Sequence, residues 1–379
     1  MRILFWSELF RPHIGGVEVW SVQLIHALQR LGYDCLAVAS HGPTRMPDET
    51  EFEGIPVCRF SFHEALLRRE LPAIRRLMAK VAELKERFRP DIIHLNTSQP
   101  SLFFHAKTTT HGPCHTVITI HEPLLESAGT NSLLGRVLGT ADKVVAVSSA
   151  MLEDLQHQTP AVSEKCRVIH NAVPPTATKP MPLAFTPPRL FCAGRLVPEK
   201  GFDLALEAFA RLHQVHKRAE LTIAGNGPAR ADLERRAAEL GVRSAVRFPG
   251  WVEPSNVTNY INAATVVIIP SRWREPFGLV ALQAAQMARP VIAHRVGGLP
   301  DIIIDNETGM LVSPGDIHGL VGALSFLLEH PGRAIEMGKA ARRRNDDVFN
   351  FQQFVSQYDE LYRSLALDYV PLSVGEPLT

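Results

Sequence analysis

The stretch Leu190–Gly201, LFCAGRLVPEKG, contains the unit from which the fold is predicted. It opens with a continuous apolar run, Leu190–Ala193, which is typical of a strand buried on both faces of a sheet. A glycine-containing loop follows, and a helix is expected to begin near Phe202. A buried strand, a tight loop and a helix in this order form the repeating unit of a parallel α/β sheet.

The same alternation continues through both halves of the chain. The predicted strands are residues 3–6, 36–39, 92–95, 116–120 and 144–147 in the first half, and 190–193, 221–224, 246–248, 266–269 and 291–293 in the second. A first helix is expected over residues 19–31. Continuous apolar strands separated by helices predict an α/β protein of two doubly wound domains with parallel sheets. Ligands are expected beyond the carboxyl ends of the strands, in the cleft between the halves.

A proline-rich segment marks the expected domain boundary. A chain of 379 residues is expected to hold two domains, at roughly 150 residues each. Residues 173–188 are rich in proline and lack apolar periodicity, which predicts a linker between domains at 1–172 and 189–355. Residues 356–379 are expected to form a C-terminal helix and tail, which could return to the N-terminal domain.

Composition excludes several classes of protein. The chain has 40 Lys and Arg residues against 39 Asp and Glu, a net charge of +1, and 45% of its residues are hydrophobic. This balance argues against a nucleic-acid specialist and against a disordered acidic protein. The five cysteines are scattered without a C-x-x-C pair, which predicts reduced thiols and no zinc site. No apolar run approaches the ~18 residues of a membrane span, and the N-terminus lacks a secretory pattern, so we expect a cytoplasmic protein.

Glycine loops after the predicted strands are candidates for anion binding. Gly15 and Gly16 follow the first strand and precede a helix, where backbone amides can meet an anion, although a simple tight turn explains them equally well. Arg195 and Lys200 lie five positions apart in the loop after the predicted strand 190–193, and could converge on a diphosphate. The alternative is a pair of solvated surface cations.

The loop Gly225-Asn226-Gly227 partly imitates the dinucleotide-binding fingerprint. That fingerprint also requires an acidic residue about 20 positions further on, which binds the ribose. Position 245 is alanine, and the next acid along the chain is Glu253. An NAD(P)-dependent dehydrogenase is therefore a weak alternative.

The run Pro270–Gln283, PSRWREPFGLVALQ, places a carboxylate beside a helix end. A strand leads to Glu275, and Pro276 stands where a helix can start. The backbone amides of Phe277, Gly278 and Leu279 would then be donors to an anion or a hydroxyl group. The alternative for Glu275 is a helix-end charge stabilised by the dipole.

Taken in order, these motifs resemble those of the family 4 retaining glycosyltransferases of the GT-B fold. The resemblance covers nearly the whole chain, and it is carried by Gly15-Gly16, Thr119–Glu122 (TIHE), Gly194–Gly201, Ala224–Pro228 (AGNGP), Glu275–Gly278 (EPFG) and Gly297–Pro300 (GGLP). It implies two Rossmann-like domains facing each other across a cleft, with the acceptor in the N-terminal domain and a nucleotide sugar in the C-terminal one. It also implies transfer of a hexosyl unit to an acceptor hydroxyl with retention, in glycan, polysaccharide or glycolipid synthesis. The family works without a bound metal or other cofactor.

The resemblance also implies roles for individual residues. Arg195 and Lys200 would neutralise the donor diphosphate, His121 would lie near the donor sugar, and Glu275 would bind its hydroxyls. The remaining donor-binding positions would be Gly15, Gly16, Gly194, Gly225, Asn226, Gly227, Phe277, Gly278, Leu279 and Gln283. A UDP-sugar and a GDP-sugar are both compatible with this set.

Two positions depart from the family pattern. Gln283 stands where the family has a second glutamate, eight residues after the first, that grips the ribose. Glutamine cannot make the charge-assisted bond, which predicts weaker nucleotide binding and leaves open a non-catalytic glycan-binding or partner subunit. Asn171-Ala172 replaces an Asn-Gly pair before the linker.

A basic segment raises the question of the acceptor. Residues 66–89 hold eight basic and three acidic residues, an excess of +5, on a helix with one apolar face. This pattern predicts either an ordinary surface helix or a surface that docks on anionic lipid at the inner face of a membrane. His111, His115 and His121 around one strand could suggest a metal site, but a structural role explains the setting as well, and no ligand role is expected for His111 and His115.

Overall fold

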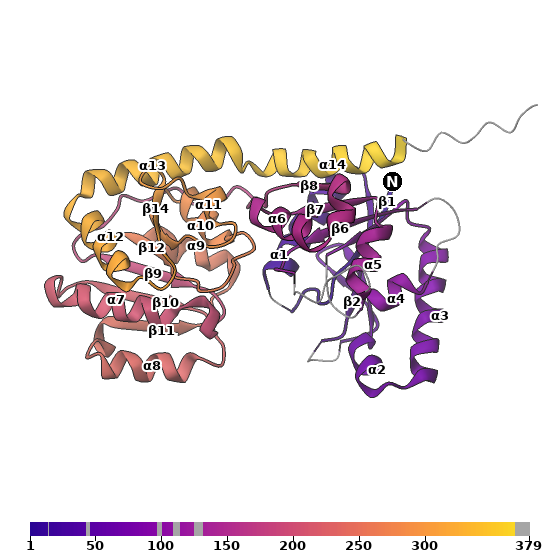
Figure 1. Ribbon diagram of the computed structural model, residues 1–379, viewed down its shortest axis with the longest axis horizontal. Coiled ribbons are helices and arrows are strands. Elements are labelled where there is room, and N and C mark those ends of the chain that lie inside the picture. Colours follow the sequence, from indigo (N-terminus) through magenta and orange to yellow (C-terminus); the bar gives the residue numbers. More distant parts are fainter. Residues whose placement is uncertain (14, 43–45, 97–100, 109–113, 125–131, 368–379) are drawn as a thin grey trace, which may run out of the picture. The chain divides into compact units, whose positions relative to one another are not determined.

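The computed structural model describes the chain except for residues 14, 43–45, 97–100, 109–113, 125–131 and 368–379 (Figure 1). The chain divides into two compact units. The N-terminal unit comprises Met1–Val147, Leu152–Ile169 and Gln352–Thr379, and the C-terminal unit comprises Ser148–Met151 and His170–Phe351. Each unit is built on one sheet flanked by helices, as expected for an α/β protein (Figure 1).

The sheet of the N-terminal unit has eight strands in the order β3-β4-β2-β1-β5-β6-β7-β8. Its strands are β1 Arg2–Trp6, β2 Asp34–Ser40, β3 Glu49–Phe52, β4 Ile55–Phe60, β5 Ile92–Leu95, β6 His115–Ile120, β7 Lys143–Ala146 and β8 Cys166–Val168. Its helices are α1 Gly16–Arg30, α2 Phe62–Arg68, α3 Leu71–Phe88, α4 Leu102–Ala106, α5 Leu133–Thr140, α6 Ser149–Gln158 and α14 Phe351–Leu367. The expectation of an all-parallel sheet is wrong at one edge, where β3 and β4 form an antiparallel hairpin. A tight turn at Glu53-Gly54 makes this pairing local, so it needs no crossover helix.

The sheet of the C-terminal unit has six parallel strands in the order β11-β10-β9-β12-β13-β14. Its strands are β9 Arg189–Ala193, β10 Glu220–Ala224, β11 Val246–Gly250, β12 Val266–Ile269, β13 Val291–His294 and β14 Gly309–Val312. Its helices are α7 Phe202–Val215, α8 Arg230–Glu239, α9 Pro254–Ala263, α10 Leu279–Gln286, α11 Leu299–Ile302, α12 Ile317–Glu329 and α13 Pro331–Val348.

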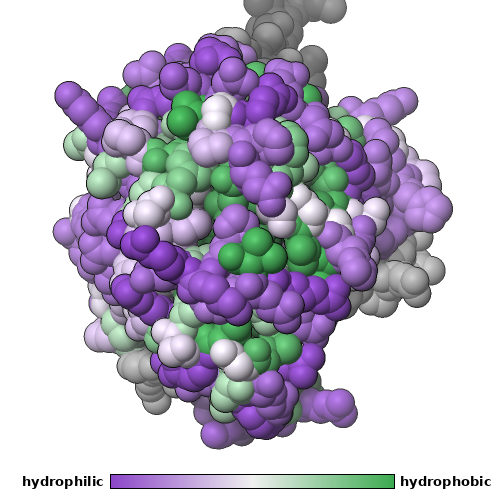
Figure 2. Space-filling model, turned by 90° about the vertical axis from the view of Figure 1, so that its left-hand side faces the viewer, coloured by the Kyte–Doolittle hydropathy of each residue, from purple (hydrophilic) through white to green (hydrophobic). Residues whose placement is uncertain are grey.

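One face of this second sheet shares a hydrophobic core with α7, α8 and α12. Helix α7 turns Leu206, Phe209 and Leu212 inward at helical spacing, and each is almost completely buried. Burying a side chain of this size stabilises the fold by about 1.5–3 kcal/mol. Figure 2, in which the C-terminal unit faces the viewer, shows a mainly hydrophilic surface with hydrophobic side chains in small patches.

The strand order of the C-terminal sheet reverses between β9 and β12. The chain runs outward from β9 through β10 to β11, then returns to β12 on the other side of β9. The loops that leave the carboxyl ends of β9 and β12 therefore diverge at this point, which is where open α/β sheets bind ligands. These are the loops that carry Gly194–Gly201 and Pro270–Gly278.

The C-terminal helix α14 packs within the N-terminal unit. Tyr33 donates a hydrogen bond to Asp359 at 2.5 Å, and His94 Nδ1 lies 2.5 Å from the Tyr362 hydroxyl. The proline-rich segment 173–188 packs instead on the C-terminal unit, where the Met181 amide donates to Asn262 at 2.8 Å. Asn262 in turn donates to the carbonyl of Lys179 at 2.9 Å.

The structure bears on the cysteines and on membrane-spanning helices. All five cysteines are free thiols. Within the described residues, no helix has both the length and the apolar character needed to cross a bilayer.

Candidate functional site

Lys200 and Glu275 meet where the loops after β9 and β12 come together. Lys200 Nζ lies 2.7 Å from Oε1 and 2.8 Å from Oε2 of Glu275. The two side chains are 22% and 12% exposed, so the pair is mostly buried but still reachable from solvent. Two of the predicted site residues, from segments 75 positions apart, are thus in direct contact.

Glu275 has two further partners that sequence reasoning missed. Ser271 Oγ donates to Glu275 Oε2 at 2.9 Å, and Trp273 Nε1 lies 3.3 Å from the same oxygen. Lys200 Nζ lies 5.8 Å from the centroid of the Trp273 ring, within cation–π range. Ser271 and Trp273 belong to the same loop as Glu275. Their closeness to Glu275 in the sequence is the signal that could have indicated them as its partners.

Gly201 allows the two loops to approach this closely. Its φ is +67°, and a Cβ atom there would lie 2.0 Å from the carbonyl oxygen of Pro270. Any residue with a side chain would separate the loops, because the neighbouring atom is backbone. The glycine after Lys200 is therefore a condition for the contact with Glu275.

Arg195 lies on the same loop as Lys200, with its side chain exposed. Within the described part of the chain its guanidinium has no hydrogen-bond or ion-pair partner, so it is available to an anion. The loop is held by the turn after β10. The Gly194 amide donates to Ala224 at 3.0 Å, and the Leu196 amide donates to the carbonyl of Asn226 at 2.9 Å.

The turn after β10 contributes backbone rather than charged groups. The Gly225 amide donates to Gly250 at 2.8 Å, and the Gly227 amide donates to the side chain of Asn226 at 3.0 Å. The first residue of α8 is Arg230. The predicted glycine positions 194, 225 and 227 are thus gathered beside Arg195.

Helix α10 begins later than expected. The prediction that it starts at Pro276 is wrong, because its first residue is Leu279 and its N-cap is Gly278 with φ +116°. Phe277 is buried, and its ring centroid lies 5.9 Å from that of Phe349. Burial of Phe277 draws the chain inward, so the helix starts only after Gly278. The amides at the start of α10 have no acceptor one full turn earlier in the helix, although the Ala281 amide donates to the carbonyl of Gly278 at 2.8 Å. Gln283 lies half-buried further along the helix.

His121, Gly15 and Gly16 belong to the N-terminal unit. Gly15 is the extended N-cap of α1 and Gly16 is its first residue. His121 follows β6, and its ring contacts Trp20 of α1 edge to face, with centroids 4.5 Å apart. His121 Nε2 is shielded from solvent and has no partner among the described residues. Burial lowers the pKa of His121 to about 3, so the ring is neutral at pH 7.

The other histidines of the predicted trio do not form a site. His115 Nδ1 lies 3.3 Å from Asp142, and His111 falls outside the described residues. No group of three His, Cys, Asp or Glu side chains is placed to hold a metal ion in the part of the chain that the structure describes.

Family models match both units of the chain. Residues 14–177 match "Glycosyltransferase Family 4", and residues 178–344 match "Glycosyl transferases group 1". The chain belongs to the family 4 glycosyltransferases. This confirms the predicted family and the predicted enzyme class, and it leaves no support for the dehydrogenase alternative.

Relatives of this glycosyltransferase span its full length. It is 27% identical to a glycogen synthase of Mycobacterium tuberculosis over 402 aligned positions, which cover 96% of this chain and 94% of the relative. A stretch of 161 residues is 35% identical to a GDP-mannose-dependent alpha-(1-6)-phosphatidylinositol monomannoside mannosyltransferase of Mycolicibacterium smegmatis, covering 41% of this chain and 42% of that one.

Solved structures confirm the predicted GT-B fold of the glycosyltransferase. A sucrose-phosphate synthase from Thermosynechococcus elongatus superposes with a TM-score of 0.84 at 24% identity, covering 97% of this chain and 100% of the other. HepE of Anabaena, in complex with UDP and glucose, gives a TM-score of 0.77 at 21% identity, covering 96% and 99%.

Proposed function

We propose that this glycosyltransferase moves a hexosyl unit from a nucleotide diphosphate sugar to an acceptor hydroxyl, with retention of anomeric configuration and without a bound metal. The N-terminal unit would receive the acceptor and the C-terminal unit the donor. The observation that carries the proposal is the Lys200–Glu275 contact at the strand-order reversal of the C-terminal sheet, on the same loop as Arg195, whose exposed guanidinium has no partner among the described residues.

The charges of this site suit the diphosphate and the sugar of a nucleotide sugar. Arg195 and Lys200 offer cationic donors to the diphosphate, and the first-turn amides of α10 add neutral ones. Glu275 accepts hydrogen bonds from sugar hydroxyls, while Ser271 and Trp273 hold its carboxylate in place. The site can thus bind the diphosphate and the adjoining sugar of a nucleotide sugar.

The same groups stabilise the leaving group. The bond between the anomeric carbon and the phosphate oxygen breaks, and the acceptor oxygen forms its bond to that carbon on the same face. The departing phosphate takes the proton of the acceptor hydroxyl. Arg195 and Lys200 stabilise the negative charge that grows on the phosphate, which lowers the barrier. His121 is neutral and therefore acts as a hydrogen-bond partner of the donor sugar rather than as a general acid.

The identity of the donor can be decided by ligand-induced stabilisation. The relatives' names include GDP-mannose for the mannosyltransferase, and UDP and glucose for HepE. A ligand at 100 times its Kd raises the free energy of unfolding by about 2.7 kcal/mol. We expect one of UDP-glucose and GDP-mannose to raise the Tm, and to release its nucleoside diphosphate when an acceptor is present. A lack of stabilisation by every nucleotide sugar, with a folded protein, would contradict the proposal.

Gln283 favours a second candidate function, a non-catalytic glycan-binding or partner subunit. A neutral side chain there would weaken the grip on a ribose, because it cannot make a charge-assisted hydrogen bond. This alternative predicts binding of a glycan without release of nucleoside diphosphate from any sugar donor. The ordered contact of Lys200 with Glu275 favours the enzyme.

We further propose that α2 and α3 dock on anionic lipid and bring a lipid-linked acceptor to the enzyme. Leu67 and Leu71, at the junction of these helices, are 68% and 66% exposed. The exposed cations nearby are Arg68, Arg69, Arg75, Arg76, Lys80, Arg87 and Arg89. Exposed leucines among cations suit an interfacial helix.

Lys85 does not belong to this basic surface, although it is one of the eight basic residues of segment 66–89. It is buried, and Nζ donates to the carbonyls of His105 at 3.2 Å and Thr108 at 2.8 Å. Burial lowers its pKa to about 8.

Vesicle flotation tests the docking proposal. We expect the protein to float with phosphatidylglycerol vesicles at low salt and to dissociate at high salt, because each cation near the surface contributes about 1 kcal/mol. Arg75→Glu/Arg76→Glu should abolish flotation, and Arg342→Glu/Arg343→Glu on α13 is the matched control. Equal flotation of the two double variants would exclude α3 as the docking surface.

A further inference from the structure

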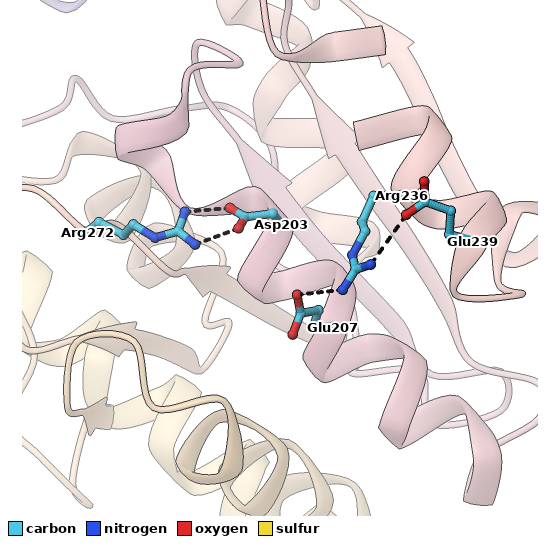
Figure 3. Close-up of polar contacts among 5 residues, drawn as sticks. All are labelled: Asp203, Glu207, Arg236, Glu239 and Arg272. Atoms are coloured by element: carbon cyan, nitrogen blue, oxygen red, sulfur yellow. Dashed lines mark hydrogen bonds and ion pairs between the residues drawn. The ribbon is translucent and has the colours of Figure 1, made fainter. Parts of the chain in front are cut away.

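Arg272 lies between the two residues that support Glu275, and its own side chain points to a different element. Its guanidinium forms a bidentate ion pair with Asp203 in the first turn of α7, with Nη1 2.5 Å from Oδ1 and Nη2 2.5 Å from Oδ2 (Figure 3). Two parallel bonds of this kind fix orientation as well as distance.

Two more hydrogen bonds join Arg272 to the turn that carries Lys200. Nη1 also donates to the carbonyl of Pro198 at 3.1 Å, and the Arg272 backbone amide donates to the carbonyl of Glu199 at 2.8 Å. One residue therefore contacts positions 198, 199 and 203, on both sides of Lys200. The close approach of Gly201 to Pro270 lies within the same span.

The surroundings of the Arg272–Asp203 pair favour the charged form of both groups. Burial alone would raise the pKa of Asp203, but the hydrogen bonds from Arg272 outweigh it and hold the pKa below its usual value. The same bonds raise the pKa of Arg272. Both groups are charged throughout the neutral range. A lysine at position 272 would keep the charge but lose the planar fork.

We propose that Arg272 and Asp203 are positioning residues, which lock the loop after β12 to the turn before α7 and so hold Lys200 against Glu275 in the geometry that binds the donor. This inference rests on the proposed roles of Lys200 and Glu275. Neither Arg272 nor Asp203 touches the donor in this assignment. Their contribution passes through the placement of the two loops.

A second ion pair on α7 provides a matched control. Arg236 of α8 donates to Glu207 at 3.0 Å and to Glu239 at 3.3 Å, and Glu207 lies one helical turn beyond Asp203 (Figure 3). The side chains of Arg236 and Arg272 are 42% and 40% exposed. The control pair joins α7 to α8, and the hydrogen bonds of Arg236 to Glu207 and Glu239 involve neither site loop. Its removal is expected to change the charge and the stability of the same helix while leaving the placement of Lys200 unchanged.

The experiment compares Arg272→Gln, Asp203→Asn, the double variant, Arg272→Lys and Arg236→Gln. We expect Arg272→Gln and Asp203→Asn each to lower kcat/KM about ten- to a hundredfold, because a displacement near 1 Å at a reacting site costs on that order. The double variant should be no worse than either single one, since the two residues act as one unit. Arg272→Lys should not restore activity, and Arg236→Gln should stay within about twofold of wild type at a similar Tm.

Three results would overturn the proposal. One is an equal loss of kcat/KM in Arg236→Gln, which would make the effect one of general stability. Another is weaker donor binding in Arg272→Gln together with wild-type binding in Asp203→Asn, which would place Arg272 on the diphosphate itself. The third is wild-type kinetics in both single variants while Lys200→Ala is impaired. Full activity in Lys200→Ala would instead refute the assigned site.

Discussion

Trp20 and His121 lie edge to face in the N-terminal unit, with ring centroids 4.5 Å apart, so helix α1 fixes the imidazole that follows β6. The ring is neutral because burial lowers its pKa to about 3, and its shielded Nε2 has no partner among the described residues. A buried, neutral and unpaired imidazole is ready to form a hydrogen bond with a ligand. The neutral, buried state of His121 therefore leads to one prediction on activity and one on stability.

We expect His121→Gln to lower kcat/KM about threefold to tenfold, the range expected for one hydrogen bond of about 0.5–1.5 kcal/mol. The size of the loss should be the same at pH 6 and pH 8, because His121 does not titrate in that range. Initial rates at both pH values measure it. A loss that grows steeply at one of the two would assign His121 a proton-transfer role.

The low pKa of His121 also predicts acid sensitivity. The unfolded chain binds a proton at this residue near pH 6.5, whereas the folded chain binds it only near pH 3. The unfolded state therefore holds more protons as the pH falls from about 6.5 towards 3, and stability is lost over that window. His121→Gln should show a shallower decline of the free energy of unfolding between pH 7 and pH 5 in urea titrations. His213→Gln on α7 is the control, and an identical slope in wild type and His121→Gln would contradict the prediction.

Lys200 should matter far more for turnover than an ordinary lysine. Lys200→Ala and Arg195→Ala are each expected to lower kcat about 10²- to 10³-fold, as for loss of one donor to a developing oxyanion. Lys217→Ala, an exposed lysine of the same unit, is the control and should leave kcat unchanged. Near wild-type turnover in both site variants would show that neither Arg195 nor Lys200 contributes to the reaction.

Gly201 and Gly241 form a natural pair for separating steric conflict from backbone strain. Their φ values are +67° and +72°, but a Cβ atom at Gly201 would lie 2.0 Å from Pro270, whereas one at Gly241 would have nothing within 4 Å. Both alanine variants incur the left-handed strain, about 1 kcal/mol or more. Only Gly201→Ala should also move Lys200 away from Glu275 and lower kcat/KM more than tenfold. Equal activity in the two alanine variants, at equal Tm, would refute the close-approach argument.

The strands could be predicted from the sequence where the apolar runs are long and flanked by glycine loops. β5 lies at the predicted residues, and β9, β10 and β12 deviate by at most a residue. β3 is not predicted because its four residues, ETEF, include two glutamates and no continuous apolar run. Its pairing with β4 is stabilised by a local turn rather than by burial. β14 was missed because its run is short, between two turns.

Only part of the site could be predicted from the sequence, and the reason is physical. Arg195, Lys200 and Glu275 stand in motifs with a chemical signature, so the sequence indicates them. The partnership of Arg272 with Asp203 joins residues 69 positions apart, and each is an ordinary charged residue in its own segment. Such pairings depend on how two loops pack, which periodicity and composition do not encode. The helix start at Leu279 was missed for the same reason, because the burial of Phe277 is a tertiary effect.

Gln283→Glu should tighten nucleotide binding. A carboxylate makes charge-assisted bonds to ribose hydroxyls that are stronger than those of an amide by about 1–2 kcal/mol, which corresponds to a Kd about fivefold to thirtyfold lower. Isothermal titration with the nucleoside diphosphate measures the change. Gln214→Glu on the exposed end of α7 controls for the added charge. An unchanged Kd in Gln283→Glu would mean that Gln283 does not reach the ribose.

The buried hydroxyl of Tyr362 should anchor α14 to the N-terminal unit. It lies 2.5 Å from His94 Nδ1, whose other nitrogen, Nε2, is 2.7 Å from Thr119, so Tyr362→Phe leaves one buried nitrogen of His94 unpaired. An unpaired buried polar group costs about 1–3 kcal/mol. Tyr33→Phe removes a bond to Asp359, but the Asp359 carboxylate is 20% exposed and still accepts hydrogen bonds from Arg363, so the loss should cost well under 1 kcal/mol. Urea unfolding of the two variants measures the difference, and an equal loss of stability would show that the His94 contact contributes no more than the Asp359 one.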